Sequence, residues 1–328
     1  MAASFLSPVN RPNPTIPRVK TTPKPKRPLR ASPRAPLRAS ESGPLIGAHM
    51  SVAGGLTLAI ERALKLRTRA VQIFTKNASQ WAAKVLKEEH CASFRSAWEE
   101  SGLAPVVAHD SYLINLASPD PALRQKSIEA FAEELRRAEA LGIRFLVTHP
   151  GAHMGSGPAA GCDRAAESIE RARALAPGTS VIVLLEAVAG QGTTLGRRFE
   201  ELARIRDQLS RRDLVGVCFD TCHVHAAGYD LVTEKGCEET FEEFDAVLGL
   251  ETLRLFHVND SKNERGSRVD RHEHLGRGRL GPEPFARILR DTRFRTVPKI
   301  LETPKGKDGV VMDRRNLAFL RRLAEETT

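Results

Sequence analysis

Eight short apolar segments, each followed by a longer segment with helical periodicity, dominate the sequence from residue 45 onwards. The apolar segments are residues 45–50, 70–74, 105–109, 145–149, 181–186, 215–220, 253–258 and 298–302. Helical periodicity is found at residues 55–67, 88–101, 120–141, 163–175, 199–209, 238–249, 283–291 and 313–325. Nearly continuous apolar strands that alternate with helices are typical of a parallel sheet covered by helices. Eight such units predict an α/β fold, a (β/α)8 TIM barrel, with a large doubly wound open sheet as the alternative.

Residues 1–43 differ in composition from the rest of the chain. Residues 1–40 contain nine Lys or Arg, nine of the 20 prolines, and no Asp or Glu. Such a segment buries too little apolar surface to offset its ordering entropy, so we expect a disordered extension before a barrel domain at 44–328. A basic, acid-free composition is typical of an organelle transit peptide, and the prolines favour a chloroplast over a mitochondrion because they disfavour an amphipathic helix. A nuclear signal around residues 24–28 and a plain tail are the alternatives.

The charge of the chain is concentrated in that extension. The formal net charge is +10, but the residues after the first 40 carry 41 of the 50 basic residues and all 40 acidic residues, a balance of +1. An anionic partner of the barrel must therefore be bound by a local basic patch. No apolar run approaches the roughly 18 residues of a membrane helix, so we expect no membrane partner.

Polar side chains stand at the carboxyl ends of the predicted strands. They are His109, His149, Glu186, Asp220, His257 and Glu302, and no strand ends in lysine. The carboxyl ends of barrel strands share one face, where active sites lie. One such histidine alone would more often be structural. Six groups crowded on a buried face must be paired, protonated or metal-bound, and a metal is the simplest way to neutralise them.

Three further candidates follow the sixth and seventh strands. His223 belongs to the segment DTCH, and Asp270 and His272 belong to the segment DRH. In extended backbone Asp270 and His272 point to the same side and can share one ion. The nine nitrogen and oxygen donors exceed the four ligands of one tetrahedral zinc and suffice for two or three ions. Zinc suits this donor set, with manganese or iron as alternatives, and a multi-metal site suggests phosphoryl hydrolysis.

Seven segments resemble the endonuclease IV family of apurinic/apyrimidinic (AP) endonucleases. They are HDSYLINL (109–116), THPGAH (148–153), GQGTTLG (190–196), VGVCFDTCHVHAAGYD (215–230), FHVNDSK (256–262), GSRVDRHEHLGRGRLG (266–281) and LET (301–303). The resemblance runs from about residue 45 to the last predicted helix. It implies a TIM barrel with three Zn²⁺ ions, for which Mn²⁺ is a substitute.

The resemblance also implies the ligand sets and the reaction. One zinc would be bound by His109, His149 and Glu186; a second by Glu186, Asp220, His257 and Glu302; and the third by His223, Asp270 and His272. Glu186 and Glu302 are then the catalytic carboxylates. The implied reaction is hydrolysis of the phosphodiester 5′ to an abasic site in double-stranded DNA, which leaves a 3′-hydroxyl and a 5′-deoxyribose phosphate. Removal of blocking groups from 3′ ends, also within base excision repair, is implied as well.

Contacts to DNA follow from the same resemblance. Tyr112 and Leu113 match residues that wedge into the duplex, which offsets the cost of extruding a nucleotide. Arg271 is expected to enter the minor groove, and Asn77 and Gln80 match the first DNA-binding loop. The alternative is ordinary loop packing for Tyr112 and Leu113, and a solvated loop side chain for Arg271.

The sequence departs from the family pattern in two places. Ser79 stands where an arginine is usual, which removes one cation from the first DNA-binding loop. Ala187 and Val188 replace two polar residues after Glu186, and we expect a hydrogen bond to a ligand to be lost there. Trp81, in the same loop as Ser79, is expected to serve packing rather than recognition.

Three alternatives to an AP endonuclease stay open at this point. The first is a metal-dependent sugar isomerase or epimerase on the same barrel, although such an enzyme usually has a lysine near the carbonyl. The second is a catalytically weakened DNA-binding relative, favoured by Ala187 and Val188. The third is a nuclease with other preferences, such as damaged RNA or 3′ ends. A monomer is expected, because one barrel holds the whole site.

Overall fold

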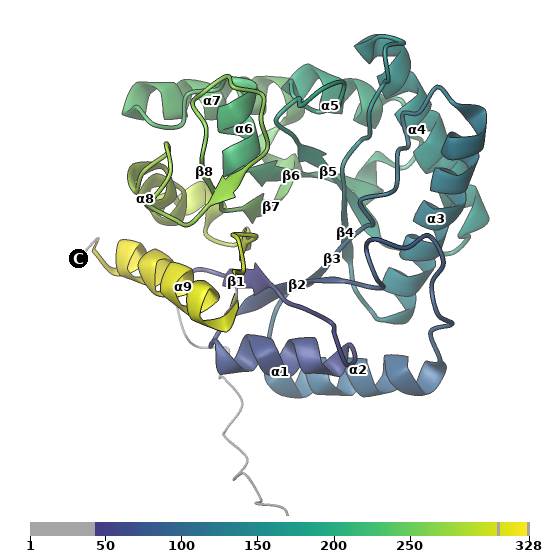
Figure 1. Ribbon diagram of the computed structural model, residues 1–328, viewed down its shortest axis with the longest axis horizontal. Helices are drawn as coiled ribbons and strands as arrows, with labels where there is room; N and C mark the ends of the chain where they lie inside the picture. Colours follow the sequence, from purple (N-terminus) through teal and green to yellow (C-terminus); the bar gives the residue numbers. More distant parts are fainter. Residues whose placement is uncertain (1–42, 307–308, 327–328) are drawn as a thin grey trace, which may run out of the picture. The chain divides into compact units, whose positions relative to one another are not determined.

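Eight parallel strands close a barrel in the computed structural model, which describes residues 43–306 and 309–326 (Figure 1). The strands are β1 (Ile46–His49), β2 (Ala70–Phe74), β3 (Val106–His109), β4 (Phe145–Thr148), β5 (Ile182–Ala187), β6 (Val215–Asp220), β7 (Leu253–His257) and β10 (Lys299–Leu301). Because β1 pairs with both β2 and β10, the sheet has no edge strand, and the predicted TIM barrel is confirmed over the open sheet. The predicted transit peptide lies outside the described residues and stays a prediction.

Helices surround the barrel, and most of them were predicted (Figure 1). They are α1 (Thr57–Lys65), α2 (Glu88–Ser101), α3 (Pro121–Ala140), α4 (Pro158–Leu175), α5 (Phe199–Asp207), α6 (Thr221–Ala227), α7 (Glu234–Leu248), α8 (Glu283–Arg290) and α9 (Gly309–Glu325). The helices α4, α7 and α9 begin four or five residues before the predicted starts. Small or polar residues precede the apolar stripes of α4 and α7, whereas α9 begins with apolar residues that are not buried. Over the described part of the chain, none of the helices is both long and apolar enough to cross a membrane.

Besides three short 3-10 helices, a helix and a two-stranded hairpin were not predicted, and these last two lie next to the carboxyl ends of the strands. The helix α6 follows β6 without a loop, and the side chain of Asp220 caps it by accepting a hydrogen bond from the backbone N–H of His223 (2.9 Å). The strands β8 (Asp260–Ser261) and β9 (His272–Glu273) form a short antiparallel pair after β7. The helix α6 carries the candidate ligand His223, β9 carries His272, and Asp270 lies in the loop between β8 and β9.

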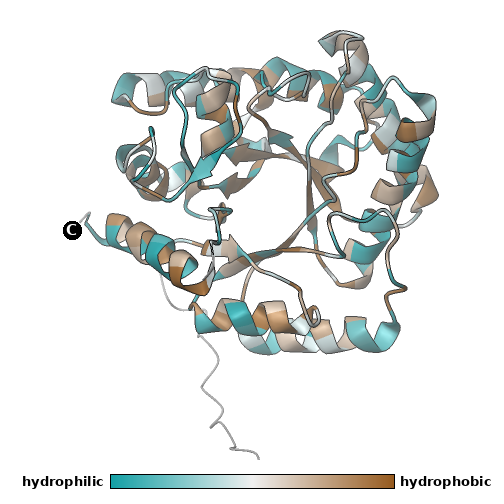
Figure 2. Cartoon of the chain, in the orientation of Figure 1, coloured by the Kyte–Doolittle hydropathy of each residue, from teal (hydrophilic) through white to brown (hydrophobic). Residues whose placement is uncertain are grey.

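Two apolar cores stabilise the barrel. The smaller core lies inside it and contains Ala70, Val107, Val147, Ile182, Leu184, Cys218, Leu255 and Ile300. The larger core packs the outer side of the strands against the helices, whose solvent faces are hydrophilic (Figure 2). Each large side chain buried in this way contributes about 1.5–3 kcal/mol to folding.

The inner core explains why the candidate ligands meet. Side chains alternate between the two faces of a strand, so the residue two positions after an inner-core residue also points inwards. Val107 is followed in this way by His109, Leu184 by Glu186 and Ile300 by Glu302. The same relation holds on β4, β6 and β7. The apolar layer therefore forms a floor, and the polar side chains form the next layer towards the carboxyl face.

Candidate metal centre

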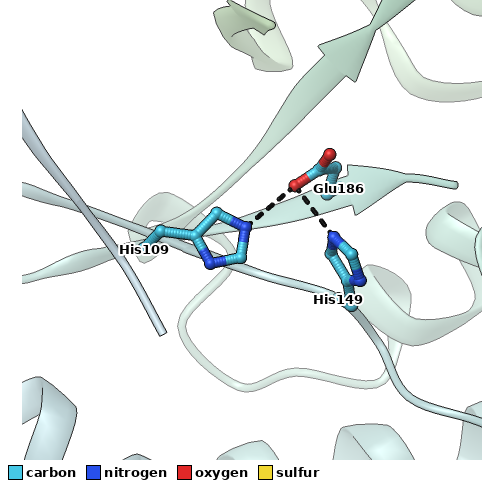
Figure 3. Close-up of side chains that lie close together, drawn as sticks. All are labelled: His109, His149 and Glu186. Atoms are coloured by element: carbon cyan, nitrogen blue, oxygen red, sulfur yellow. Dashed lines mark hydrogen bonds and ion pairs between the residues drawn. The ribbon is translucent and has the colours of Figure 1, made fainter. Parts of the chain in front are cut away.

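Three residues from consecutive strands form the first donor group (Figure 3). The Nε2 atoms of His109 and His149 each lie 3.3 Å from the same oxygen of Glu186, Oε2. Glu186 and His109 are buried, whereas the side chain of His149 is 38% exposed. The strands β3, β4 and β5 thus bring together the first predicted ligand set.

The second group shares Glu186 with the first and lies deeper in the barrel. The Nδ1 atom of His257 lies 3.2 Å from Glu186 Oε1, 3.1 Å from Glu302 Oε2 and 3.9 Å from Asp220 Oδ2. Glu186 therefore directs one carboxylate oxygen to each group. Such a placement suits a carboxylate that bridges two cations.

The third group is built from the helix α6 and the hairpin of β8 and β9, which were not predicted. The Nε2 atom of His223, on α6, lies 3.2 Å from Asp270 Oδ2. The Nε2 atom of His272, on β9, lies 3.4 Å from Asp270 Oδ1 and 3.6 Å from Asp220 Oδ2. The expectation that Asp270 and His272 face the same point is confirmed, and the nine candidate ligands form one contiguous cluster.

Four of the histidine rings also lie near an oxygen acceptor outside the donor groups, although His223 Nδ1 lies 3.1 Å from Glu186 Oε1 as well. The Nδ1 atoms of His109, His223 and His272 lie 3.0–3.2 Å from the main-chain oxygens of Asp110, Ala187 and Glu302, and His257 Nε2 lies 2.8 Å from Gln72 Oε1. When the outer ring nitrogen donates its proton to such an acceptor, the other nitrogen keeps a free lone pair. This is the usual arrangement of metal-binding histidines, so the residues present fit a metal centre.

The charges of the cluster reinforce one another. Burial raises the pKa of Glu186, but the neighbouring imidazoles of His257 and His149 outweigh burial and hold that pKa well below its usual range. Burial likewise raises the pKa of Asp270, and contacts with His223 reverse the shift and lower the value to about 2. Burial lowers the pKa of His109, yet the contacts with Asp110 and Glu186 hold it well above the ordinary value. The carboxylates thus stay ionised and attract positive charge, which is the condition for binding cations.

Sequence reasoning missed two amides that organise the cluster. Gln72, on β2, donates from Nε2 to Glu302 Oε1 (2.6 Å) and accepts from His257 Nε2. Asn259 donates to Asp220 Oδ2 (2.7 Å) and accepts from the backbone N–H of Glu302 (2.8 Å). Both amides are fully buried. The available signal was a single polar residue within the apolar segment AVQIF, and an Asn two residues after the end of β7.

His49 also contacts this cluster, although it was not predicted to be a ligand. Its Nδ1 atom lies 3.5 Å from Glu302 Oε1 and 3.0 Å from Gln72 Nε2. Burial lowers the pKa of His49 more than the adjacent Glu302 raises it. His49 is therefore a neutral neighbour of the second group.

A cavity of about 1980 Å³ opens above the cluster. Its lining includes six of the nine candidate ligands: His109, His149, His223, Asp270, His272 and Glu302. The other three are buried beneath them. A substrate in this cavity would meet Glu302 as the exposed member of the second group.

Four of the predicted DNA-binding residues line the same cavity. Tyr112 is 70% exposed and packs its ring edge-on against Phe74 at the cavity wall, with 5.3 Å between ring centroids. Asn77, Gln80 and Arg271 are exposed on its rim. Leu113 is half-buried beside Tyr112 and does not line the cavity.

The positions that depart from the family pattern have plain structural surroundings. Ser79 is exposed on the cavity rim. Ala187 and Val188 are buried and apolar, and the contact of Ala187 to His223 is made by its main-chain oxygen, which any residue would supply. Trp81 packs against the outer core, as expected, and Lys126 Nζ lies 4.5 Å from its ring centroid.

The fold and the donor cluster define a TIM-barrel protein with a candidate metal centre, and comparison with known proteins agrees on the fold. A family model described as a xylose isomerase-like TIM barrel matches residues 60–323. A D-tagatose 3-epimerase-like protein superposes with a TM-score of 0.65 at 17% identity, covering 86% of this chain and 98% of that one. At this identity the likeness shows the fold alone.

Relatives at higher identity narrow the class to one family. A probable endonuclease 4 from Geobacter sulfurreducens is 50% identical over 283 residues, covering 86% of this chain and 95% of the relative. A probable endonuclease 4 from Chloroflexus aggregans is 50% identical over 281 residues, covering 86% and 98%. The crystal structure of endonuclease IV from Thermus thermophilus superposes with a TM-score of 0.77 at 36% identity, covering 87% of this chain and all of that one. The chain belongs to the endonuclease IV family and is an endonuclease, as the sequence resemblance implied.

Proposed function

We propose that this protein is a zinc-dependent AP endonuclease of DNA repair that cleaves the phosphodiester 5′ to an abasic site. The products are a 3′-hydroxyl and a 5′-deoxyribose phosphate, and blocked 3′ ends are a second substrate. The observation that carries the proposal is the cluster of nine donors beneath a cavity, in a chain 50% identical to endonuclease 4 relatives. The proposed working form is a monomer.

The three donor groups would each hold one zinc, and Mn²⁺ is the expected substitute. Zinc at such a site supplies a Lewis acid that offsets phosphate charge and activates water at neutral pH. The donors are imidazole nitrogens and carboxylate oxygens, which suit zinc. Because Glu186 offers one oxygen to each of two groups, it couples the positions of two ions.

The chain's own residues bind and orient the DNA. The exposed ring of Tyr112, with Leu113 beside it, provides an apolar wedge that fills the space left when the abasic nucleotide leaves the helix. Arg271 and the loop containing Asn77 and Gln80 provide polar contacts on the rim of the cavity. The cluster carboxylates repel a phosphate unless cations neutralise them, so productive binding requires the metal-loaded protein.

The test is incision of a duplex that carries one abasic analogue. Protein stripped by a chelator should lose incision and regain it when zinc is added, and a DNA polymerase should extend the product from its 3′-hydroxyl. Incision that persists after complete removal of metal would refute the proposal. Zinc-loaded protein that binds abasic DNA tightly without cleaving it would instead identify a binding-only relative. Turnover of a free sugar, unaffected by DNA, would identify an epimerase.

A further inference from the structure

A buried network of charged side chains lies under the loop that joins β2 to α2, outside the metal centre. We call Lys76, Glu134 and Arg137 the charged clamp. Their side chains are almost fully buried, with exposures of 4%, 1% and 7%. Lys76 belongs to the loop, whereas Glu134 and Arg137 belong to α3. Burying three charges is costly unless each one is satisfied by specific partners.

The clamp binds the main chain of the loop at three points. Arg137 donates to the main-chain oxygen of Thr75 (2.6 Å) and to that of Lys84 (3.0 Å). Lys76 donates to the main-chain oxygen of Gln80 (2.9 Å). The loop from 75 to 84 is therefore held at its start, its middle and its end.

Glu134 balances the two cations. One of its oxygens lies 3.5 Å from Lys76 Nζ, and the other accepts a 2.6 Å hydrogen bond from the hydroxyl of Thr75. The same hydroxyl accepts a hydrogen bond from Arg137 Nε (3.1 Å). The network has two cations, the buried anion Glu134 and a hydroxyl that connects them, and the partly exposed Glu133 lies 3.8 Å from Arg137 at its edge. Loss of Glu134 or Arg137 therefore leaves a buried charge without a buried partner.

The loop is also connected to the loop that follows β3. The hydroxyl of Ser111 donates to the main-chain oxygen of Ala78 (2.6 Å). Ser111 lies next to Tyr112 in the chain, and Asn77 lies next to Ala78. The wedge and the first DNA-binding loop are thus fixed with respect to each other.

From these contacts we infer that the charged clamp positions Asn77 and Gln80 for DNA binding, with Glu134 and Arg137 as positioning residues. This inference rests on the proposed function, because it assumes that the loop contacts DNA. Neither helical residue reaches the metal ligands through a direct contact. The clamp should therefore affect substrate binding and leave metal loading unchanged.

The experiment uses Trp81, which lies in the loop, as a reporter. The chain has only two tryptophans, so replacing Trp98 by Phe leaves Trp81 as the only tryptophan, whose fluorescence can be excited apart from that of the two tyrosines. In that background Arg137→Met should increase acrylamide quenching of Trp81, because the loop is released. The same variant should raise KM for an abasic duplex about tenfold with little change in kcat, as expected for lost uniform binding. Zinc content should equal that of the unmutated protein.

Matched variants separate the clamp from a general loss of stability. Arg124→Met changes another arginine of α3, which pairs with Glu167 on α4 rather than with the clamp, and should alter neither readout. Arg137→Lys keeps the charge with fewer donors and should restore part of the loss. If Arg137→Met fails to fold, quenching of Trp81 and KM are measured on Glu134→Gln instead. This variant keeps nearly the same shape and only removes the charge.

Each outcome decides the inference. Unchanged quenching of Trp81 in Arg137→Met would refute the clamp. Increased quenching with an unchanged KM would refute its role in positioning the DNA contacts. Absence of incision by the unmutated protein would contradict the proposed function instead, and the quenching measurement would still test the clamp.

Discussion

Replacing Gln72 by Met should weaken the metal centre without changing any candidate ligand. Gln72 is fully buried on β2 and joins two members of the second donor group through hydrogen bonds of 2.6 Å to Glu302 and 2.8 Å to His257. Met has nearly the same volume and length as Gln, so the substitution removes the amide while it leaves little empty space.

The expected loss of zinc affinity follows from these two contacts. Without the amide, the outer N–H of His257 has no acceptor in a buried site, which costs about 1–3 kcal/mol. Glu302 loses a donor to its carboxylate, and a hydrogen bond to a charged group contributes about 1.5–3 kcal/mol. Losses of partners behind metal ligands typically lower metal affinity by about 10–100-fold, which corresponds to about 1.4–2.7 kcal/mol. We expect zinc affinity at the second donor group to fall by this factor.

The assay is competition for zinc between the protein and a chromogenic chelator, with incision measured on the same samples. Gln125→Met is the matched control, because Gln125 is half-buried on α3 and its hydrogen bonds, to Glu129 and from Arg171, lie on the surface. Zinc affinity and incision that are unchanged in a folded Gln72→Met variant would refute the argument that this amide orients His257 and Glu302.

Three further predictions follow from the site and the barrel. Asp270→Ala should lose one zinc per chain and abolish incision, whereas Glu273→Gln, on the same hairpin but outside the donor groups, should not; wild-type turnover in the first variant would contradict the ligand role. Stripped of metal, the protein should be most stable between about pH 4.5 and 6.5. The raised pKa of His109 stabilises the fold below its unfolded value, and this contribution disappears as pH rises through the folded-state pKa. The lowered pKa of Glu186 stabilises the fold above its unfolded value, and that contribution is lost as pH falls through the folded-state pKa. A Tm that climbs steadily from pH 6 to pH 9 in calorimetry would be inconsistent with these shifts. Lys299→Met should stabilise the fold by about 1–2 kcal/mol in chemical denaturation. Burial of the ammonium lowers its pKa to about 8, and the nearby charge of Asp291 offsets little of that cost. A less stable variant would show that the hydrogen bond to Phe294 outweighs the cost of burial.

The barrel and the ligand positions were predictable because both depend on short-range periodicity. Eight short apolar segments alternate with helical segments, and residues two positions apart on a strand share a face. That rule alone places His109, Glu186 and Glu302 at one level of the barrel. The division of the ligands into three groups came from the family resemblance, since spacing along the chain does not determine which strand ends approach one another.

The parts that were not predicted depend on contacts between distant residues. The helix α6 has only seven residues, so it shows too little periodicity for recognition, although Asp220 is a suitable capping residue. Gln72 is a single polar residue in an apolar strand. Its role becomes clear only from the fold, which places His257 and Glu302 beside it. Arg137 would be assigned to a solvated helix face from sequence, but the loop 75–84 covers it. Each of these features forms only when segments far apart in the chain are packed together.

The central claim is that nine side chains form three adjoining cation sites at the carboxyl face of the barrel. The most direct measurement is anomalous X-ray scattering at the zinc edge from crystals of the zinc-loaded protein. The account predicts three strong peaks: one among His109, His149 and Glu186, one beside Glu302 and His257, and one at the β9 hairpin. A single peak, or peaks away from these groups, would contradict it.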